Sequence, residues 1–247
     1  MKKLSTLLLF LVFNATVIAQ ASFGFKINGG VSMITDKIYD PNIETHTNYF
    51  KPSGQVGFFY NLPLRTDQVF GVELLFTQIE SKEKIVDTLG TAYTNYPNGA
   101  IPLLSTYTIS KHISYLSLPV HYGINVRNFT FNVGMQFSVR LLSSAQEIEQ
   151  DSYTNNASGY GFVLTPSTTT YNYKKLSIKD VDFGQTVGII YHFTNNIFAI
   201  EGNYYYGFNN IYPNTRRTTE WRTQQITLGI RYTFFKRGCQ IKRPQTT

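Results

Sequence analysis

Alternation of apolar and polar residues with a period of two recurs along this chain, in segments of about ten to thirteen residues. In the clearest segment, 129–141, the odd-numbered residues are apolar and the even-numbered ones are polar or small. A strand places alternate side chains on opposite faces, so this segment has one apolar and one polar face. Strands of this length exceed the roughly five to six residues that are usual in soluble domains. The pattern predicts long antiparallel strands with one face against an apolar medium.

Eight such segments share an apolar face and a second face rich in glycine, serine, threonine, asparagine and glutamine. They lie at about 23–33, 55–62, 70–77, 115–124, 129–141, 181–193, 198–208 and 226–234. A solvated surface would carry more lysines, whereas small polar side chains are what a narrow barrel lumen admits. We predict an all-β fold, an eight-stranded antiparallel up-and-down transmembrane β-barrel of the outer-membrane type.

The composition agrees with strands that cross a membrane. Charged residues make up only 15% of the chain, and aromatic residues make up another 15%. Beyond the first twenty residues no run of about 18 apolar residues occurs, so a transmembrane helix is not expected. A membrane role must then come from a closed barrel, which satisfies every backbone hydrogen bond within the lipid. Aromatic residues near the strand ends are typical of interfacial girdles, although aromatic β-propensity alone gives a similar pattern.

The first residues have the features of a secretory signal peptide. Lys2 and Lys3 precede an apolar run, and small residues follow at Ala19 and Ala21. Cleavage before Gln20 or before Ser22 fits, and the first is preferred. We therefore expect residues 1–19 to be the signal peptide, 20–235 the outer-membrane barrel, and 236–247 a basic, polar periplasmic tail. The predicted location is the cell outer membrane.

The connectors alternate in predicted length. Short turns are expected at 63–67, 125–128 and 194–196, and long loops at about 35–53, 80–111, 143–178 and 209–221. Short periplasmic turns and longer extracellular loops are the outer-membrane pattern. Within the third loop, the threonine-rich stretch 165–173 is predicted either to be mobile or to add short strands above the membrane. Pro119 lies inside a predicted strand and predicts a bulge or a kink, because proline lacks the ladder N–H.

The inner face is predicted to carry charges of both signs in equal number. The three cations of this face are Lys26, Arg140 and Arg231, and its three anions are Glu73, Asp182 and Glu201. Buried charges are costly unless they are paired and hydrogen-bonded. We expect these six residues to form a structural network of salt bridges that fills the lumen, with a proton or ion path as the alternative.

Four short motifs follow one another along nearly the whole mature chain. They are the Tyr-Leu-Ser-Leu-Pro stretch at 115–119, Phe-Asn-Val-Gly at 131–134, Asp-Phe-Gly at 182–184 and Gly-Ile-Arg-Tyr at 229–232. In their order and spacing they resemble the PorT-like outer membrane β-barrel family of Bacteroidetes. The resemblance implies an eight-stranded barrel, and one kind of member takes part in protein secretion across the outer membrane. A shared fold does not by itself transfer that role.

The sequence offers little catalytic or cofactor chemistry. The four histidines, His46, His112, His121 and His192, have no metal-ligand spacing, and Cys239 is the single cysteine. No nucleotide-binding glycine loop and no Gly-x-Ser-x-Gly elbow occurs. We predict no catalytic residue, no cofactor and no metal. The basic residues are scattered, so nucleic-acid binding is not expected.

Three classes of function remain for a barrel of this kind. The preferred one is a non-enzymatic structural or interaction component, acting through its extracellular loops or periplasmic ends in envelope or secretion assembly. The alternatives are a small channel or porin, and a barrel enzyme that acts on lipid A or peptide. An eight-stranded barrel has an interior just filled by side chains, which disfavours a pore. The expected partners are outer-membrane lipid and envelope or secretion-complex proteins.

Overall fold

The computed structural model describes residues 21–37, 44–89, 103–153, 167–174, 176, 178–194, 197–211 and 220–236. Within these residues no helix is long and apolar enough to cross a membrane. The described residues form strands β1 (Ser22–Lys37), β2 (Glu44–Pro63), β3 (Gln68–Leu89), β4 (Leu103–Val126), β5 (Phe129–Tyr153), β6 (Ser167–Tyr173), β7 (Val181–His192), β8 (Phe198–Gly207) and β9 (Glu220–Lys236). The predicted signal peptide, and the tail beyond Lys236, lie outside these residues.

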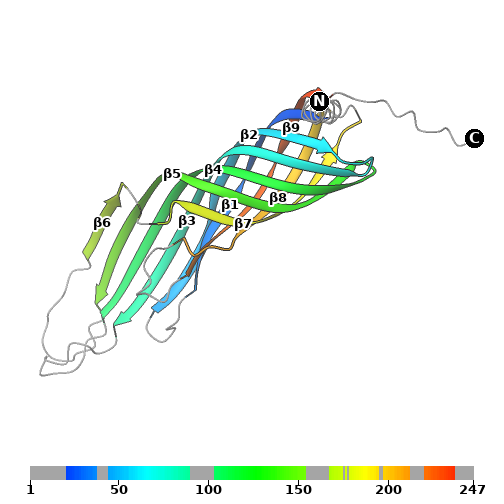
Figure 1. The fold of residues 1–247 in the computed structure, drawn as a ribbon. Coiled ribbons are helices and arrows are strands. Elements are labelled where there is room, and N and C mark those ends of the chain that lie inside the picture. The colour runs from blue at the N-terminus through cyan, green and yellow to red at the C-terminus, as the bar shows by residue number, and fades with distance from the viewer. Residues whose placement is uncertain are drawn as a thin grey trace, which may run out of the picture.

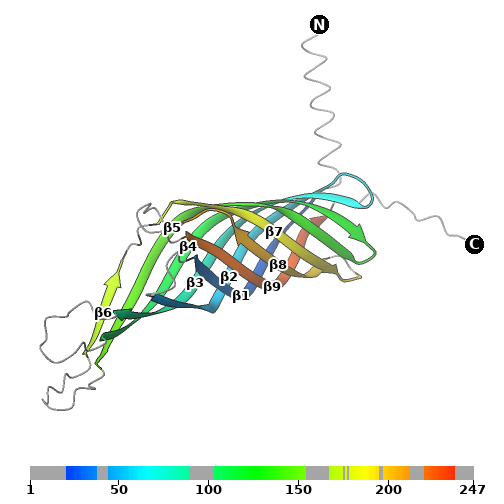
Figure 2. The ribbon, with the colours of Figure 1, turned by 90° about the horizontal axis from the view of Figure 1, so that it is seen from below.

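Eight of the strands close into a ring. The order is β4-β3-β2-β1-β9-β8-β7-β5, and pairing of β4 with β5 completes the circle. All neighbours are antiparallel. The first strand meets the last one, with Ser22 opposite Lys236. Figures 1 and 2 show the strands winding obliquely around a common axis. The predicted eight-stranded up-and-down barrel is confirmed.

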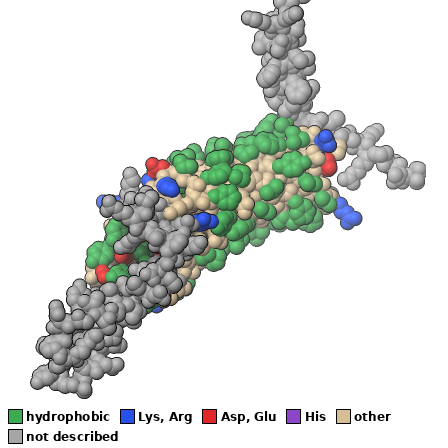
Figure 3. All heavy atoms as spheres, turned by 60° about the horizontal axis from the view of Figure 1, so that its bottom comes forward, with side chains coloured by type: hydrophobic (Ala, Val, Ile, Leu, Met, Phe, Trp, Pro, Cys, Tyr) green, Lys and Arg blue, Asp and Glu red, His purple; other side chains and the backbone are tan. Residues whose placement is uncertain are grey.

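The predicted faces have the expected environments. On β5, Phe131, Val133 and Phe137 are exposed on the outside, whereas Asn132 and Gln136 are buried in the lumen. Figure 3 shows apolar side chains gathered over the outer wall, with charged ones near its two ends. This arrangement is the reverse of a soluble protein and fits a wall that faces lipid.

Aromatic side chains meet in two groups on the outer wall. Near the short turns, the rings of Phe129 and Tyr191 lie 5.1 Å apart, and those of Phe23 and Phe58 lie 5.7 Å apart. Toward the opposite end, the ring of Phe183 lies 4.6 Å from that of Phe137. Aromatic side chains therefore contact one another toward both ends of the apolar wall, where girdles were predicted.

The short turns predicted at 63–67 and 125–128 lie where the sequence placed them, but the long loops do not. Residues 195 and 196 of the third predicted short turn lie outside the described residues. Arg127, in the two-residue turn between β4 and β5, has φ of 56°, a left-handed conformation that tight turns require. At the other end, strands β2 to β5 continue through much of the predicted loops. Residues 44–53, 80–89, 103–111 and 143–153 are strand, so the loop prediction is wrong there. These segments have polar residues on both faces, and the alternation that marks a membrane strand is lost.

The ninth strand, β6, lies outside the ring. It pairs with the far end of β5, from Ala145 opposite Tyr173 to Asp151 opposite Ser167. Of the two predicted outcomes for this threonine-rich stretch, the structure shows the added strand. The far parts of β2, β3, β4 and β5 together with β6 form a sheet beyond the barrel, which we call the extension (Figure 1).

Pro119 interrupts one ladder of β4 and not the other. Toward β5 the pairing is continuous, with Pro119 opposite Gln136. Toward β3 the pairing stops between Val120 and Ser117 and then resumes. Proline has no N–H to donate, so the break falls on the side where a hydrogen bond would be needed. The prediction of a local irregularity at Pro119 is confirmed.

The adjacent glycines Gly29 and Gly30 of β1 differ in the space beside them, so substitutions at the two positions test how closely each is packed. A Cβ on Gly30 would lie 1.9 Å from the Ile226 carbonyl oxygen, whereas nothing lies within 4 Å of a Cβ on Gly29. Because backbone cannot easily move aside, we expect Gly30→Ala to lower the free energy of unfolding by about 1–3 kcal/mol. The matched Gly29→Ala should change it by less than about 0.5 kcal/mol. Urea titration of the heat-modifiable gel band measures both, and equal midpoints would contradict this packing.

Candidate functional site: the barrel lumen

Four charged side chains meet inside the barrel in what we call the charge layer, formed by Lys26, Glu73, Glu201 and Arg231. The Lys26 ammonium lies 2.7 Å from a Glu73 oxygen and 2.5 Å from a Glu201 oxygen. The Arg231 guanidinium lies 3.3 Å from Glu73 and 3.0 Å from Glu201. All four residues are between 1% and 4% exposed. Two cations and two carboxylates therefore neutralise one another inside the barrel, shielded from the bulk solvent.

Neighbouring strands and polar side chains hold the charge layer in place. Lys26 of β1 is directly opposite Arg231 of β9 in the ladder. The Asn28 amide donates a hydrogen bond of 2.7 Å to Glu201. The Arg231 guanidinium also lies 3.9 Å from the centroid of the Phe59 ring. These additional contacts are what a buried ion pair needs to offset the loss of hydration.

The other two residues of the predicted network lie elsewhere. Arg140 forms its ion pair with Asp180, which is largely exposed, and donates 2.9 Å to the Leu176 carbonyl oxygen. The ladder has a bulge beside Arg140, because Tyr115 is opposite Arg140 while the preceding Ser114 is opposite Leu142. Arg140 is therefore aimed at the outer mouth and not at the charge layer. Among the described residues, Asp182 has no cationic partner, so the six predicted residues do not form a single network.

Hydroxyl groups surround the Asp182 carboxyl where a cation was expected. Asp182 is 1% exposed and faces the hydroxyls of Tyr205 and Thr223, with Tyr115 close by. Within the described part of the chain, Asp182 Oδ1 and both phenol oxygens have no hydrogen bond of ordinary geometry. The sequence pattern placed both tyrosines on the inner face but gave them no role. A long aromatic side chain with a polar end, among small inner-face residues, was the available signal.

An apolar cluster covers the end of the lumen opposite the short turns, and we call it the outer cap. Its buried members are Ile34, Ile79, Ile113, Tyr115, Ile178 and Ile211, with Leu176 and Trp221 packed against them. Ile178 and Ile211 come from segments outside the strands, and alternation could not identify them. The Lys179 N–H donates 2.7 Å to the Ile211 carbonyl, and the Ile211 N–H donates 3.0 Å to that of Trp221. Two connecting segments are thus tied across the top of the lumen.

A buried ion pair supports the outer cap from the side of the extension. The Lys111 ammonium lies 2.6 Å from Glu83 and 3.4 Å from the centroid of the Trp221 ring. Lys111 and Glu83 are each 2% exposed. The sequence analysis did not assign either residue to the lumen, because both lie in a stretch predicted to be loop.

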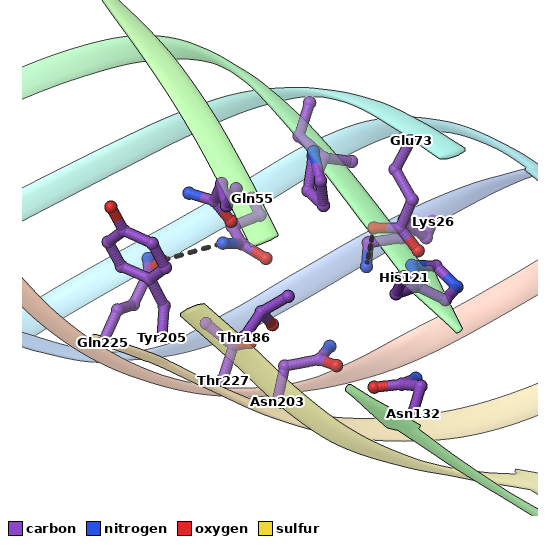
Figure 4. A pocket seen from close by; sticks show the side chains of 13 residues that line it. Lys26, Gln55, Glu73, His121, Asn132, Thr186, Asn203, Tyr205, Gln225 and Thr227 are labelled. Atoms are coloured by element: carbon purple, nitrogen blue, oxygen red, sulfur yellow. Dashed lines mark hydrogen bonds and ion pairs between the residues drawn. The ribbon is translucent and has the colours of Figure 1, made fainter. Parts of the chain in front are cut away.

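A small cavity separates the outer cap from the charge layer. Its volume is about 20 Å³, and its lining includes Lys26, Glu73, His121, Tyr205 and Gln225. Figure 4 shows these side chains converging from different strands, with a Gln55 to Gln225 hydrogen bond of 2.7 Å across the lumen. A volume of about 10–15 Å³ or more admits one water molecule, so this space has room for about one water molecule and is too small for a solute.

The histidines serve different local roles and do not come together. His121 lines the small cavity, His112 lies 3.2 Å from Glu80 in the extension, and His192 lies 2.8 Å from the Thr130 hydroxyl. The side chain of His46 lies outside the described residues. Across the described ranges, no group of three or more histidine, cysteine, aspartate or glutamate side chains could hold a metal ion.

A closed ring of antiparallel strands, apolar outside and polar inside, defines an integral β-barrel of the outer-membrane type. Residues 18–212 match the family described as the outer membrane protein beta-barrel domain. The chain belongs to this family, and the outer membrane is its indicated location. No match was found among the curated proteins.

Several solved structures are similar to this chain at low sequence identity. Ail of Yersinia pestis is 8% identical, with 87% of this chain and 99% of Ail covered and a TM-score of 0.36. Neisserial surface protein A is 13% identical, with the same coverage of both chains and a TM-score of 0.36. OprG of Pseudomonas aeruginosa is 12% identical, with 87% and 97% covered and a TM-score of 0.38.

Proposed function

We propose that this protein is a closed outer-membrane barrel that acts as a structural or interaction component through its extension. One observation carries the proposal. The lumen is filled by the charge layer, the hydroxyl groups around Asp182 and the outer cap, whereas strands β2 to β6 build an ordered sheet beyond the barrel. A filled interior leaves no path for solutes, and a folded sheet above the membrane offers a surface for recognition.

The extension has features of a recognition surface. Tyr171 and Tyr173 on β6 are 43% and 44% exposed, next to the carboxylates of β5. The Tyr173 hydroxyl donates 3.0 Å to Glu147, and this bond raises the pKa of Tyr173 above its usual value. Among the described residues β6 pairs with β5 alone, and an unpaired strand edge can accept a strand of another protein. Exposed tyrosines are also frequent in protein interfaces.

The channel alternative has less support. A conducting path would have to pass an ion-paired layer, a cavity of one-water size and an apolar cap. Each of these layers lies across the same narrow lumen of eight strands, which side chains alone can fill. No observation among the described residues favours an enzyme.

Partners in envelope or secretion assembly fit this role. The resemblance to the PorT-like barrels of Bacteroidetes supports such a context, and export through a signal peptide at 1–19 supports delivery to the envelope. Outer-membrane lipid contacts the apolar wall, and the basic tail after residue 235 would face the periplasm. Within the lumen, Lys26, Glu73, Glu201 and Arg231 have a structural role in this proposal.

Site-specific photo-crosslinking in intact cells tests the proposed role. A benzophenone amino acid at Tyr171 samples the extension, and the same amino acid at Tyr60, 38% exposed on the apolar wall, is the matched control. We expect a discrete protein adduct from position 171 that position 60 does not form. Identical adduct patterns from the two positions, or lipid adducts alone, would contradict a protein-recognition role of the extension.

A further inference from the structure

A polar groove crosses the outer surface of the extension where it joins the barrel. Its volume is about 450 Å³. The ladder places Glu80 opposite His112 and His112 opposite Ser144, so these three residues form one row across β3, β4 and β5. Lys51 of β2 and Lys174, just after β6, line the two ends of this groove.

The groove lies at the level where the apolar wall ends. Leu141 and Leu142 of β5 are 50% and 69% exposed on the outside, and Ser144 follows two residues later. On β5, Ser144 is therefore the first polar residue of the outer face beyond the lipid-facing side chains. A lipid packed against Leu142 would have its headgroup beside the groove and not beside the lumen. The position of the groove relative to the lipid follows from the barrel alone and is independent of the proposed function.

The lining suits an anionic, hydroxyl-rich ligand. Ser110, Ser144, Gln146 and Asn172 supply hydrogen-bond donors and acceptors, as sugar recognition requires. Lys51 and Lys174 supply positive charge at the two ends, and among the described residues neither is in an ion pair. Four strand spacings of about 4.8 Å place their backbones roughly 19 Å apart. A ligand with two separated anionic groups could form one ionic contact with each lysine.

One carboxylate in the groove opposes this charge, but it is already engaged. Glu80 Oε1 lies 3.2 Å from His112 Nδ1 and accepts a hydrogen bond of 3.2 Å from the Gln78 amide. With Glu80 held in this way, the remaining charge of the groove is positive. Basic residues at a membrane surface attract anionic headgroups, and lysine binds phosphate as a point charge.

We propose that this groove binds the phosphorylated sugar headgroup of a glycolipid in the outer leaflet. The acyl chains lie on the apolar wall below Ser144, and the headgroup lies across the row from Lys51 to Lys174. A glycolipid fits better than a free sugar phosphate, because the groove is continuous with the lipid-facing side and contacts with the wall add to contacts with the headgroup.

Native mass spectrometry of the full barrel in detergent tests the proposal, with bis-phosphorylated lipid A as the probe. The double variant Lys51→Gln/Lys174→Gln should raise the dissociation constant roughly tenfold to hundredfold, since each lysine makes a charge-assisted contact. The control Arg65→Gln/Lys84→Gln removes the same amount of charge outside the groove. It should leave the dissociation constant of lipid A within about twofold of the wild-type value. If the double variant fails to fold because Lys51 supports folding, the single variant Lys174→Gln, at an exposed position, still tests the groove and should also weaken lipid A binding.

Two further probes separate the sources of the phosphate. Lipid A without its phosphates should bind wild type about as weakly as lipid A binds the double variant. Inorganic phosphate, which lacks acyl chains, should not displace lipid A at millimolar concentration. Equal binding of lipid A by the double variant and the control, or displacement by inorganic phosphate alone, would overturn the proposal.

Discussion

Replacing Glu201 by Gln is expected to lower the free energy of unfolding of the barrel by about 3–5 kcal/mol, the cost of breaking a buried ion pair on one side. Glu201 accepts from both Lys26 and Arg231, and it is 1% exposed. Glutamine keeps the shape and removes the charge, so two cations would share Glu73 alone. The heat-modifiable gel shift, followed over a urea series in lipid vesicles, measures the change.

A surface carboxylate provides the control for Glu201→Gln. Asp67 lies exposed in the short turn between β2 and β3, and Asp67→Asn should change stability by less than about 0.5 kcal/mol. A second comparison replaces Lys26 by Met together with Glu201 by Gln. Removing one cation and one anion restores neutrality and should recover part of the loss. If Glu201→Gln behaved like Asp67→Asn, the charge layer would not stabilise the barrel.

Replacing Ile211 by Ala is expected to loosen the outer cap while the barrel stays closed as a ring. Ile211 is fully buried among isoleucines from three strands, and such truncations cost about 2–5 kcal/mol. The cost falls on a connecting segment, so it should appear as local opening and not as global unfolding. Amide exchange of Lys179 and Ile211, which bond across the cap, should accelerate roughly 30-fold to a few thousand-fold.

Ile190→Ala is the matched control for the outer cap. Ile190 is 3% exposed and lies on β7, outside the apolar cluster of the cap. The Ile190→Ala variant should lower the global free energy of unfolding by a similar amount. The ratio of the exchange rate of the Lys179 amide to that of the barrel amides should stay unchanged. Equal effects of the two variants on the Lys179 amide would show that the cap does not open as a separate unit.

Alternation was sufficient to predict the ring and its faces, because lipid on one side and a narrow lumen on the other impose a period of two. It failed beyond the membrane. Residues 103–111 of β4 continue the strand with polar side chains on both faces, because beyond the lipid neither face has to be uniformly apolar. Only the partner strands β3 and β5 hold this segment extended, and pairing of that kind leaves no periodic mark in a sequence.

The lumen was predictable in composition but not in geometry. Which inner-face charges meet depends on stagger and on bulges, and the bulge beside Arg140 moves that residue to the outer mouth. A single extra residue in a strand changes every later register. The outer cap was not predictable by alternation because Ile178 and Ile211 are isolated apolar residues in irregular segments. Their burial depends on contacts between distant parts of the chain.

Single-channel recording in planar lipid bilayers tests the filled lumen most directly. The purified, heat-modifiable full-length protein is inserted and held at both polarities in molar potassium chloride. The charge layer, the cavity of about 20 Å³ and the outer cap predict no steady current above that of the bare bilayer. A stable ohmic conductance that scales with the number of inserted barrels would contradict the account.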